Sequence, residues 1–219
     1  MKITWLGHSS FKLVESTGTS IVTDPFDEGV VGFPMPKVMA NAVTVSHKHG
    51  DHNAIKSVLG SPQIIDELGA FEVDGIHIQS MHSYHDNVKG AKRGENLIFK
   101  FRMDGVELCH LGDIGEECNV TIVEAIMPVD ILFVPIGGNY TIDAVQAKEY
   151  VDKIMPDIVI PMHYRTRDCE LDIDKLNEFI DLFDEDDVIY ADSDTLEYDR
   201  ADFDGETTKV VVLDKVQLR

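Results

Sequence analysis

The sequence predicts an α/β protein in which two β-sheets stack on each other and helices cover the outside. In the first half of the chain, short apolar segments are punctuated by glycines, as in a β-meander, whereas helical and strand periods alternate in the second half. A chain of 219 residues with 43% hydrophobic and 27% charged residues can bury the core that such layers need. We expect residues 1–219 to form one domain.

Strands dominate the first half of the chain. Asp104-Gly105 indicates a tight hairpin turn, and Gly60, Gly69 and Gly75 are expected to turn further hairpins. Between the strands, residues 26–41 are expected to form a long irregular loop and residues 53–59 a short helix. The expected strands are residues 2–6, 10–14, 19–23, 42–45, 63–65, 70–73, 76–81, 96–101 and 106–110.

The hydrophobic period becomes helical from about residue 120 onward. Helices are expected at residues 121–126, 142–155 and 173–183, and Thr141 is a plausible N-cap of the second of them. Pro156 stops that second helix. The strands expected between and after these helices are residues 130–136, 158–160, 188–190, 195–198 and 209–213.

Composition excludes several classes of function. The net charge of −21 disfavours binding to long nucleic acids, which are usually gripped by a basic face. The longest uncharged stretch, residues 131–142, is too short to span a membrane, and residues 2–6 look like a strand rather than a secretory signal. The three cysteines show no metal-site spacing, so we expect reduced thiols in a cytoplasmic protein.

A dense cluster of ligand-type residues lies at residues 46–52, with the sequence Ser-His-Lys-His-Gly-Asp-His. Imidazole and carboxylate groups together suit borderline divalent metals. His47 and His49 project to the same side if the chain is extended, and Gly50 lets the backbone turn before Asp51 and His52. Such an arrangement can hold two metals. The alternative, a surface histidine cluster at a strand end, seldom arises at this density by chance.

Other ligand-type residues stand at the ends of later strands. His85 follows one expected strand, Asp113 follows another, and His163 follows a third. His82 competes with His85, which is preferred because an aspartate and a glycine-rich loop follow it. His8, between the first two strands, is either an ordinary turn residue or part of the same site.

Three further polar residues need an explanation. Asp24 follows a buried apolar run, where a carboxylate needs a partner. A ligand histidine's second nitrogen or the backbone of the His47 loop would provide one, which makes Asp24 a supporting residue behind the ligands. His110 is interpreted as a core or supporting residue, and His77 as an ordinary strand residue.

The ordered motif H-x-H-x-D-H, then a histidine, an aspartate and a histidine, resembles the metallo-β-lactamase superfamily. Over roughly residues 1–165 the chain looks most like the branch related to UlaG-type lactonases. The resemblance implies a four-layer αββα sandwich and a binuclear site. The segments that carry the closer resemblance are Gly7-His8-Ser9, Asp24-Pro25-Phe26, His85-Asp86, His110-Leu111-Gly112-Asp113, Gly137-Gly138-Asn139-Tyr140-Thr141 and Pro161-Met162-His163-Tyr164.

The resemblance also implies a role for each ligand-type residue. One metal would be bound by three histidines and the other by an aspartate and two histidines, with Asp113 bridging them. The metals would be Zn²⁺ or Mn²⁺, with Fe²⁺ or Ni²⁺ as alternatives. The first ligand set is His47, His49 and His85, and the second is Asp51, His52 and His163.

Hydrolysis by a metal-activated hydroxide is the expected chemistry. Asp51 would orient the hydroxide, while His8, Tyr140 or Tyr164 would act as a proton donor or contact the substrate. The best local cations for a phosphate group are Lys92, Arg93 and Arg165.

Function is therefore expected to be hydrolysis of a small phosphodiester or other anionic ester. A lactone is the alternative substrate, and a non-catalytic metal or ligand sensor is the alternative of another class. We expect a small-molecule partner and no membrane partner, and assembly into a homo-oligomer through the apolar residues 30–35 is left open.

Overall fold

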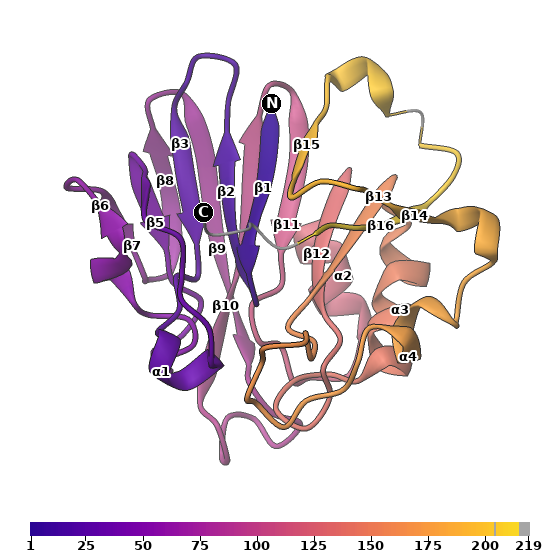
Figure 1. Ribbon diagram of the computed structural model, residues 1–219. Helices are drawn as coiled ribbons and strands as arrows, with labels where there is room; N and C mark the ends of the chain where they lie inside the picture. The colour runs from indigo at the N-terminus through magenta and orange to yellow at the C-terminus, as the bar shows by residue number, and fades with distance from the viewer. Residues whose placement is uncertain (204, 215–219) are drawn as a thin grey trace.

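Two β-sheets packed face to face form the centre of this computed structural model, which describes residues 1–203 and 205–214 (Figure 1). The first sheet contains β1 (Lys2–Gly7), β2 (Ser10–Val14), β3 (Ser20–Thr23), β5 (Ala42–Thr44), β7 (Gln63–Ile65) and β15 (Thr195–Glu197). Its strand order is β15-β1-β2-β3-β5-β7, so the late strand β15 pairs with the first strand of the chain.

The second sheet is where the chain changes from a meander to a parallel arrangement. It contains β8 (Gly69–Val73), β9 (Ile76–Tyr84), β10 (Glu95–Met103), β11 (Val106–His110), β12 (Ile131–Pro135), β13 (Ile158–Met162), β14 (Val188–Tyr190) and β16 (Lys209–Val212). Strands β8 to β11 are antiparallel neighbours, whereas β11, β12, β13, β16 and β14 are joined by parallel pairs. The predicted change of period in mid-chain is confirmed.

Helices flank the two sheets. Figure 1 shows α2 (Val120–Ile126), α3 (Ala144–Ile154) and α4 (Asn177–Ile180) gathered beside the second sheet. The first sheet is covered more thinly, by α1 (Glu28–Val31), the 3₁₀ turn Ile55–Ser57 and the short strands β4 (Val38–Met39) and β6 (Val58–Leu59). The four-layer α/β fold is confirmed. Within the described ranges, no helix has the length and apolar character needed to cross a membrane.

Side chains that alternate along the strands of the first sheet pack into two hydrophobic cores, one on each face of the sheet. Ile21 and Ala42 face the main core between the sheets, while their neighbours Val22 and Val43 face a smaller core on the outer side. Val31 of α1 belongs to that smaller core. Because successive side chains of a strand point to opposite faces, this sheet is buried on both sides.

Two helix predictions were wrong in their details. Asp143, not Thr141, caps α3: its side chain accepts from the Gln146 backbone, and the Gln146 side chain accepts from the backbone of Asp143. The helix expected at residues 173–183 is reduced to α4. The backbone of Asp174 instead pairs with Gly137 and Arg165, which takes that segment out of the helical ladder.

Several predictions for the first half also needed correction. The loop at residues 26–41 contains α1 and β4, and the helix expected at residues 53–59 is a single 3₁₀ turn followed by β6. Gly60 does not turn a hairpin, because β6 before it pairs with β4 and β7 after it pairs with β5. Gly69 does not turn one either, because β7 lies in the first sheet and β8 in the second. The hairpin turns at Gly75 and at Asp104-Gly105 are confirmed.

Candidate metal centre

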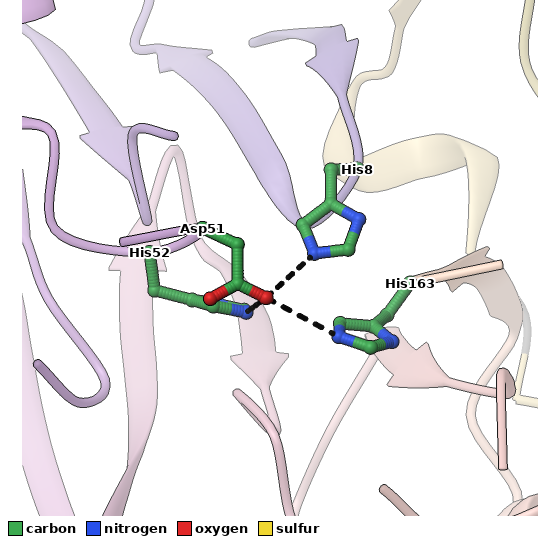
Figure 2. Close-up of side chains that lie close together, drawn as sticks. All are labelled: His8, Asp51, His52 and His163. Atoms are coloured by element: carbon green, nitrogen blue, oxygen red, sulfur yellow. Dashed lines mark ion pairs between the residues drawn. The ribbon is translucent and has the colours of Figure 1, made fainter. Parts of the chain in front are cut away.

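The ligand-type residues meet at one end of the two sheets. They come from the β1–β2 turn, from the loop after β5, and from the ends of β9, β11 and β13. Figure 2 shows how His8, Asp51, His52 and His163, which come from three segments far apart in the sequence, point toward one another. The predicted ligands brought together here are His47, His49, Asp51, His52, His85, Asp113 and His163.

The loop after β5 differs from the expected extended segment. Strand β5 ends at Thr44, and residues 46–52 follow a series of bends and a turn. The turn is closed by the His52 amide, which donates to the carbonyl of His49 at 3.0 Å. His47 and His49 therefore meet, with ring centroids 4.7 Å apart, because the chain folds back and not because they share a strand face.

Two groups of donor atoms can be distinguished. In the first group, the ring of His85 lies 4.5 Å from that of His47 and 5.0 Å from that of His49. In the second group, Oδ2 of Asp51 lies 3.4 Å from His8 Nε2, 3.6 Å from His52 Nε2 and 3.9 Å from His163 Nε2 (Figure 2). In Figure 2 the other Asp51 oxygen lies on the side away from His8 and His163.

Asp113 lies between the two groups. Its Oδ1 is 3.1 Å from His52 Nε2, and its Oδ2 is 3.2 Å from His163 Nε2. The same Oδ2 lies 3.4 Å from His85 Nε2 and 3.8 Å from His47 Nε2. This single carboxylate thus contacts histidines of both groups, which is the position expected for a bridging ligand.

A buried carboxylate behind the ligands fixes the orientation of two rings. Both oxygens of Asp24 accept from Ser46, at 2.7 Å from its amide and 2.6 Å from its hydroxyl. Asp24 also lies 2.8 Å from Nδ1 of His52. Since the carboxylate only accepts, Nδ1 of His52 carries a proton, so in the neutral ring it is Nε2 that offers a lone pair.

The same carboxylate acts on His47 through Ser46. The Ser46 hydroxyl donates its proton to Asp24, so its oxygen accepts from Nδ1 of His47 at 3.0 Å. Nε2 of His47 then faces the centre with a free lone pair. Asp24 was predicted to support a ligand histidine or the loop backbone, and it contacts both. Ser46 gave no signal in the sequence, because a hydroxyl beside a ligand has no distinctive pattern.

The electrostatics of the site favour a cation. Burial lowers the pKa of His47 to about 3 and, together with His163, that of His8 to about 4. Burial would also lower the pKa of His163, but Asp113 outweighs it and raises that pKa to about 9. Burial opposes ionisation of Asp113, yet His163 and His52 hold its pKa well below the ordinary value. The carboxylates therefore attract positive charge into a buried space.

The residues present fit a metal ion. Several buried atoms that face the centre lack a hydrogen-bond partner: Nε2 of His8, His47, His52 and His163, and Oδ1 of Asp113. Buried polar atoms without partners are costly, and metal ligation satisfies them. Ligands about 2.1 Å from a tetrahedral metal lie roughly 3.4 Å apart, close to the spacings around Asp113.

Asn96 on β10 holds the Asp113 turn. It is fully buried, its Oδ1 accepts from the Asp113 amide at 2.8 Å, and its Nδ2 donates to Ser83 and to the carbonyl of Leu111. Gly112 has a left-handed φ of 57°, and a Cβ there would collide with Asn96. Asn96 was missed by sequence reasoning, although a polar residue at an apolar strand position was the available signal.

His110 ties the same turn to the loop that carries His8. The Gly112 amide donates to Nδ1 of His110 at 3.1 Å, so Nε2 carries the proton and donates to the carbonyl of Ser9 at 2.9 Å. Both nitrogens are occupied and the residue is buried. His110 therefore supports the site without facing it, as expected.

Comparison with known proteins identifies the family. The family model described as "Beta-lactamase superfamily domain" matches residues 2–163, a range that contains every predicted metal ligand. The chain belongs to the beta-lactamase superfamily. A UPF0173 metal-dependent hydrolase of Carboxydothermus hydrogenoformans is 33% identical over 197 residues, which cover 76% of this chain and 85% of that protein.

Solved structures similar to this superfamily member include other hydrolases of this kind. A candidate Zn-dependent hydrolase of the metallo-beta-lactamase superfamily from Thermotoga maritima has a TM-score of 0.79 and 38% identity, and the match covers 97% of each chain. A candidate metal-dependent hydrolase from Parabacteroides distasonis has a TM-score of 0.64 and 20% identity, covering 97% of this chain and 93% of that one. The second likeness concerns the fold alone.

Some predicted site residues of this superfamily member lie at the pocket and others do not. Tyr140 and Arg93 line the cavity that contains His49, Asp51 and Asp113. Tyr164, by contrast, stacks on Trp5, with ring centroids 5.6 Å apart, and lines a different cavity.

The structure also shows where Arg165 and the two competing histidines, His82 and His85, lie relative to the metal centre. Arg165 is exposed and does not line the cavity at the metal centre. Between the two competing histidines, His85 approaches Asp113, whereas His82 is exposed and pairs with Glu95 at 3.4 Å. His77, on β9, is exposed and pairs with Glu72 at 3.6 Å.

Proposed function

We propose that this protein hydrolyses a small anionic ester, with a phosphodiester as the leading substrate class, at a centre of two divalent metal ions. The observation that carries the proposal is the position of Asp113, whose carboxylate contacts His47 and His85 on one side and His52 and His163 on the other. Relatives named as metal-dependent hydrolases support the reaction class.

The ligand sets follow from the two groups of donors. His47, His49 and His85 would hold one ion, and Asp51, His52 and His163 the other, with Asp113 shared. His8 joins the second group, because its Nε2 lies 3.4 Å from Asp51 and its ring lies 4.3 Å from that of His163. Zn²⁺ or Mn²⁺ suits this mixture, and Fe²⁺ or Ni²⁺ can replace them. When bound, such ions bring the pKa of water toward neutrality and polarise the oxygen of the reacting group.

The chain's own side chains complete the reaction. Asp51 is partly exposed, and its carboxylate would orient the attacking water and accept its proton. Tyr140, in the same cavity, is placed to donate to the oxygen on which charge develops or to the leaving alcohol. One water is consumed, and the ester bond is replaced by an acid and an alcohol.

The proposal is tested by comparing His49→Ala with a matched control, His77→Ala. Both variants remove one exposed histidine, but only His49 belongs to the ligand groups. Metal content and turnover of a generic phosphodiester would be measured on metal-loaded protein. We expect His49→Ala to lose one of its two metal ions and its turnover, while His77→Ala keeps its metal content and its turnover. Full activity in His49→Ala would contradict the proposal.

A cyclic ester is the second candidate substrate. The cavity at the metal centre has a volume of about 300 Å³, and Val30 and Leu171 form part of its wall, which suits a small ring with an apolar face. A panel of phosphodiesters, lactones and β-lactams on metal-loaded protein separates the two. Bound metal with no turnover of any member would favour a metal or ligand sensor instead.

A further inference from the structure

Arg93 lies where three neighbouring cavities meet. The first is the metal pocket of about 300 Å³, lined by His49, Asp51, His85, Asp113 and Tyr140 among others. The second, which we call the polar pocket, measures about 310 Å³, and the third, the outer groove, about 530 Å³. Among the residues that the structure describes, Arg93 alone lines all three.

The polar pocket carries a net positive charge. Lys92 and Arg93 line it, and neither forms an ion pair within residues 1–203 and 205–214. Its one carboxylate, Asp86, is already engaged: four backbone amides of the 86–94 loop donate to it at 2.8–2.9 Å. The protein has 40 acidic and 19 basic residues, and two of the basic ones line this single cavity. Such cations beside a cavity attract an anion.

The outer groove has the opposite character. Three carboxylates line it, from Asp66, Glu67 and Glu95. Its Lys48 lies 3.9 Å from Asp66, and its His82 pairs with Glu95. An anionic ligand would be repelled there, so the charges favour the polar pocket.

Arg93 is held in place for recognition. Its Nη2 donates to the carbonyl of Asn139 at 2.7 Å, and its guanidinium lies over the Tyr140 ring, 5.4 Å from the ring centre. These two contacts use one N–H, and no other guanidinium hydrogen bond occurs among the described residues. A fixed, planar guanidinium with free N–H groups suits an oxyanion with two acceptor oxygens.

We propose that the polar pocket binds a terminal oxyanion, a carboxylate or a phosphate, of the molecule whose ester bond lies in the metal pocket. Arg93 forms the shared wall and contacts the oxyanion, and Lys92 adds a second positive charge. The substrate is therefore an ester that carries an anionic group besides the one that reacts. The statement about the ester rests on the proposed function, whereas the oxyanion site stands on its own.

Binding is tested on zinc-loaded full-length protein by NMR titration with inorganic phosphate and, separately, with succinate. We expect saturable amide shifts at Lys92, Arg93, Gly115, Asn139 and Thr141, and the tighter probe identifies the oxyanion. Arg93→Gln should weaken binding by about tenfold or more. The matched control is Lys89→Gln, which removes an exposed charge from the same loop but does not line the polar pocket. Absent saturation, or equal weakening in both variants, overturns the site.

Turnover then tests its use. Each test compares two esters that are identical except at a distal position. One member carries a carboxylate or phosphate there, and the other carries a neutral amide. Wild type should favour the anionic member by at least about tenfold in kcat/KM, and Arg93→Gln, but not Lys89→Gln, should abolish the preference. Equal turnover of both members in wild type overturns the proposal and leaves the hydrolase intact. Saturable, Arg93-dependent probe binding without turnover of any ester instead supports the oxyanion site and overturns the proposed function.

Discussion

The two ends of the β-sandwich are built on different principles. Strand β2 runs from Ser10, beside the metal centre, to a distant turn where the backbone and hydroxyl of Ser16 donate to Asp104. Asp104 belongs to the β10–β11 hairpin, and its left-handed φ of 49° is what an Asp-Gly turn requires. At that end, hydrogen bonds join the two sheets.

The metal end contains conformations and atoms that cost free energy. His8, Asp24 and His163 have left-handed φ values of 52°, 39° and 52°, as Asp104 has at the other end, so the backbone alone does not distinguish the two ends. Ligand nitrogens there are buried without a hydrogen bond. Unpaired buried polar atoms gather at functional sites, so one end of the molecule provides stability and the other is arranged for a ligand.

The largest effect is expected from Asp113→Asn. Its carboxylate contacts both histidine groups, so we expect the affinity for both ions to fall and turnover to drop to background. Asp104→Asn, the same change at the opposite end, should keep its metal. Elemental analysis and activity on the two variants provide the check, and normal metal content in Asp113→Asn would refute the shared-ligand assignment.

The two histidine groups should differ in how firmly they hold metal. His49 is exposed at the mouth of the pocket, whereas His163 is completely buried beside Asp51 and Asp113. We therefore expect chelators to remove about one ion early and the other late, given one ion per group. His49→Ala should lose only the early ion, and His163→Ala should lose the late one. Simultaneous release of both ions in wild type would argue against this difference.

Asp24→Asn and Ser46→Ala should separate direct from indirect support of the ligands. Asp24 contacts His52 directly and His47 only through Ser46. Asp24→Asn should therefore lower the affinity for both ions by about 10–100-fold. Ser46→Ala should affect mainly the ion at His47. Chelator competition measures both affinities, and an equal loss of both ions in Ser46→Ala would break the proposed chain of hydrogen bonds.

The smallest effect concerns stability at the opposite end. Burial opposes ionisation of Asp104, but hydrogen bonds from Ser16 and the N-terminal ammonium of Met1, 3.3 Å away, outweigh it and lower its pKa. A group whose pKa is lower in the folded state contributes stability above its unfolded pKa of about 3.9 and loses it as the pH falls through the folded value. Asp104→Asn should cost about 1 kcal/mol in urea unfolding at neutral pH, and the difference should shrink in acid. A cost independent of pH would contradict the charge-based explanation.

Sequence reasoning found the residues that cluster at the site because their chemistry is local. Histidine and aspartate at the ends of apolar strands, such as His85 and His163, are unusual whatever the rest of the fold does. Ser46 and Asn96 were missed, since a neutral polar side chain acquires its role only from partners that tertiary folding supplies. That the seven predicted ligands bind metal stays a prediction, although the structure brings them together.

Helix boundaries depend on whether backbone groups bond within the helix or to distant segments, and the sequence does not reveal which. The apolar period at residues 173–183 is genuine, but the backbone of Asp174 bonds to Gly137 and Arg165 near the site instead of continuing a helix. The sequence also did not reveal that β7 and β8 belong to different sheets. Strand lengths and turn residues look the same whether the chain forms a hairpin or crosses from one sheet to the other.

The pairing of β1 with β15 has a consequence for how the molecule is made. Thr4 and Thr195 are 191 positions apart, and their hydroxyls lie 2.9 Å from each other. The strand that leads into His8 therefore acquires its outer neighbour only after nearly all of the chain has left the ribosome. Closing so long a loop is slow, so the edge of the first sheet is completed late in biosynthesis.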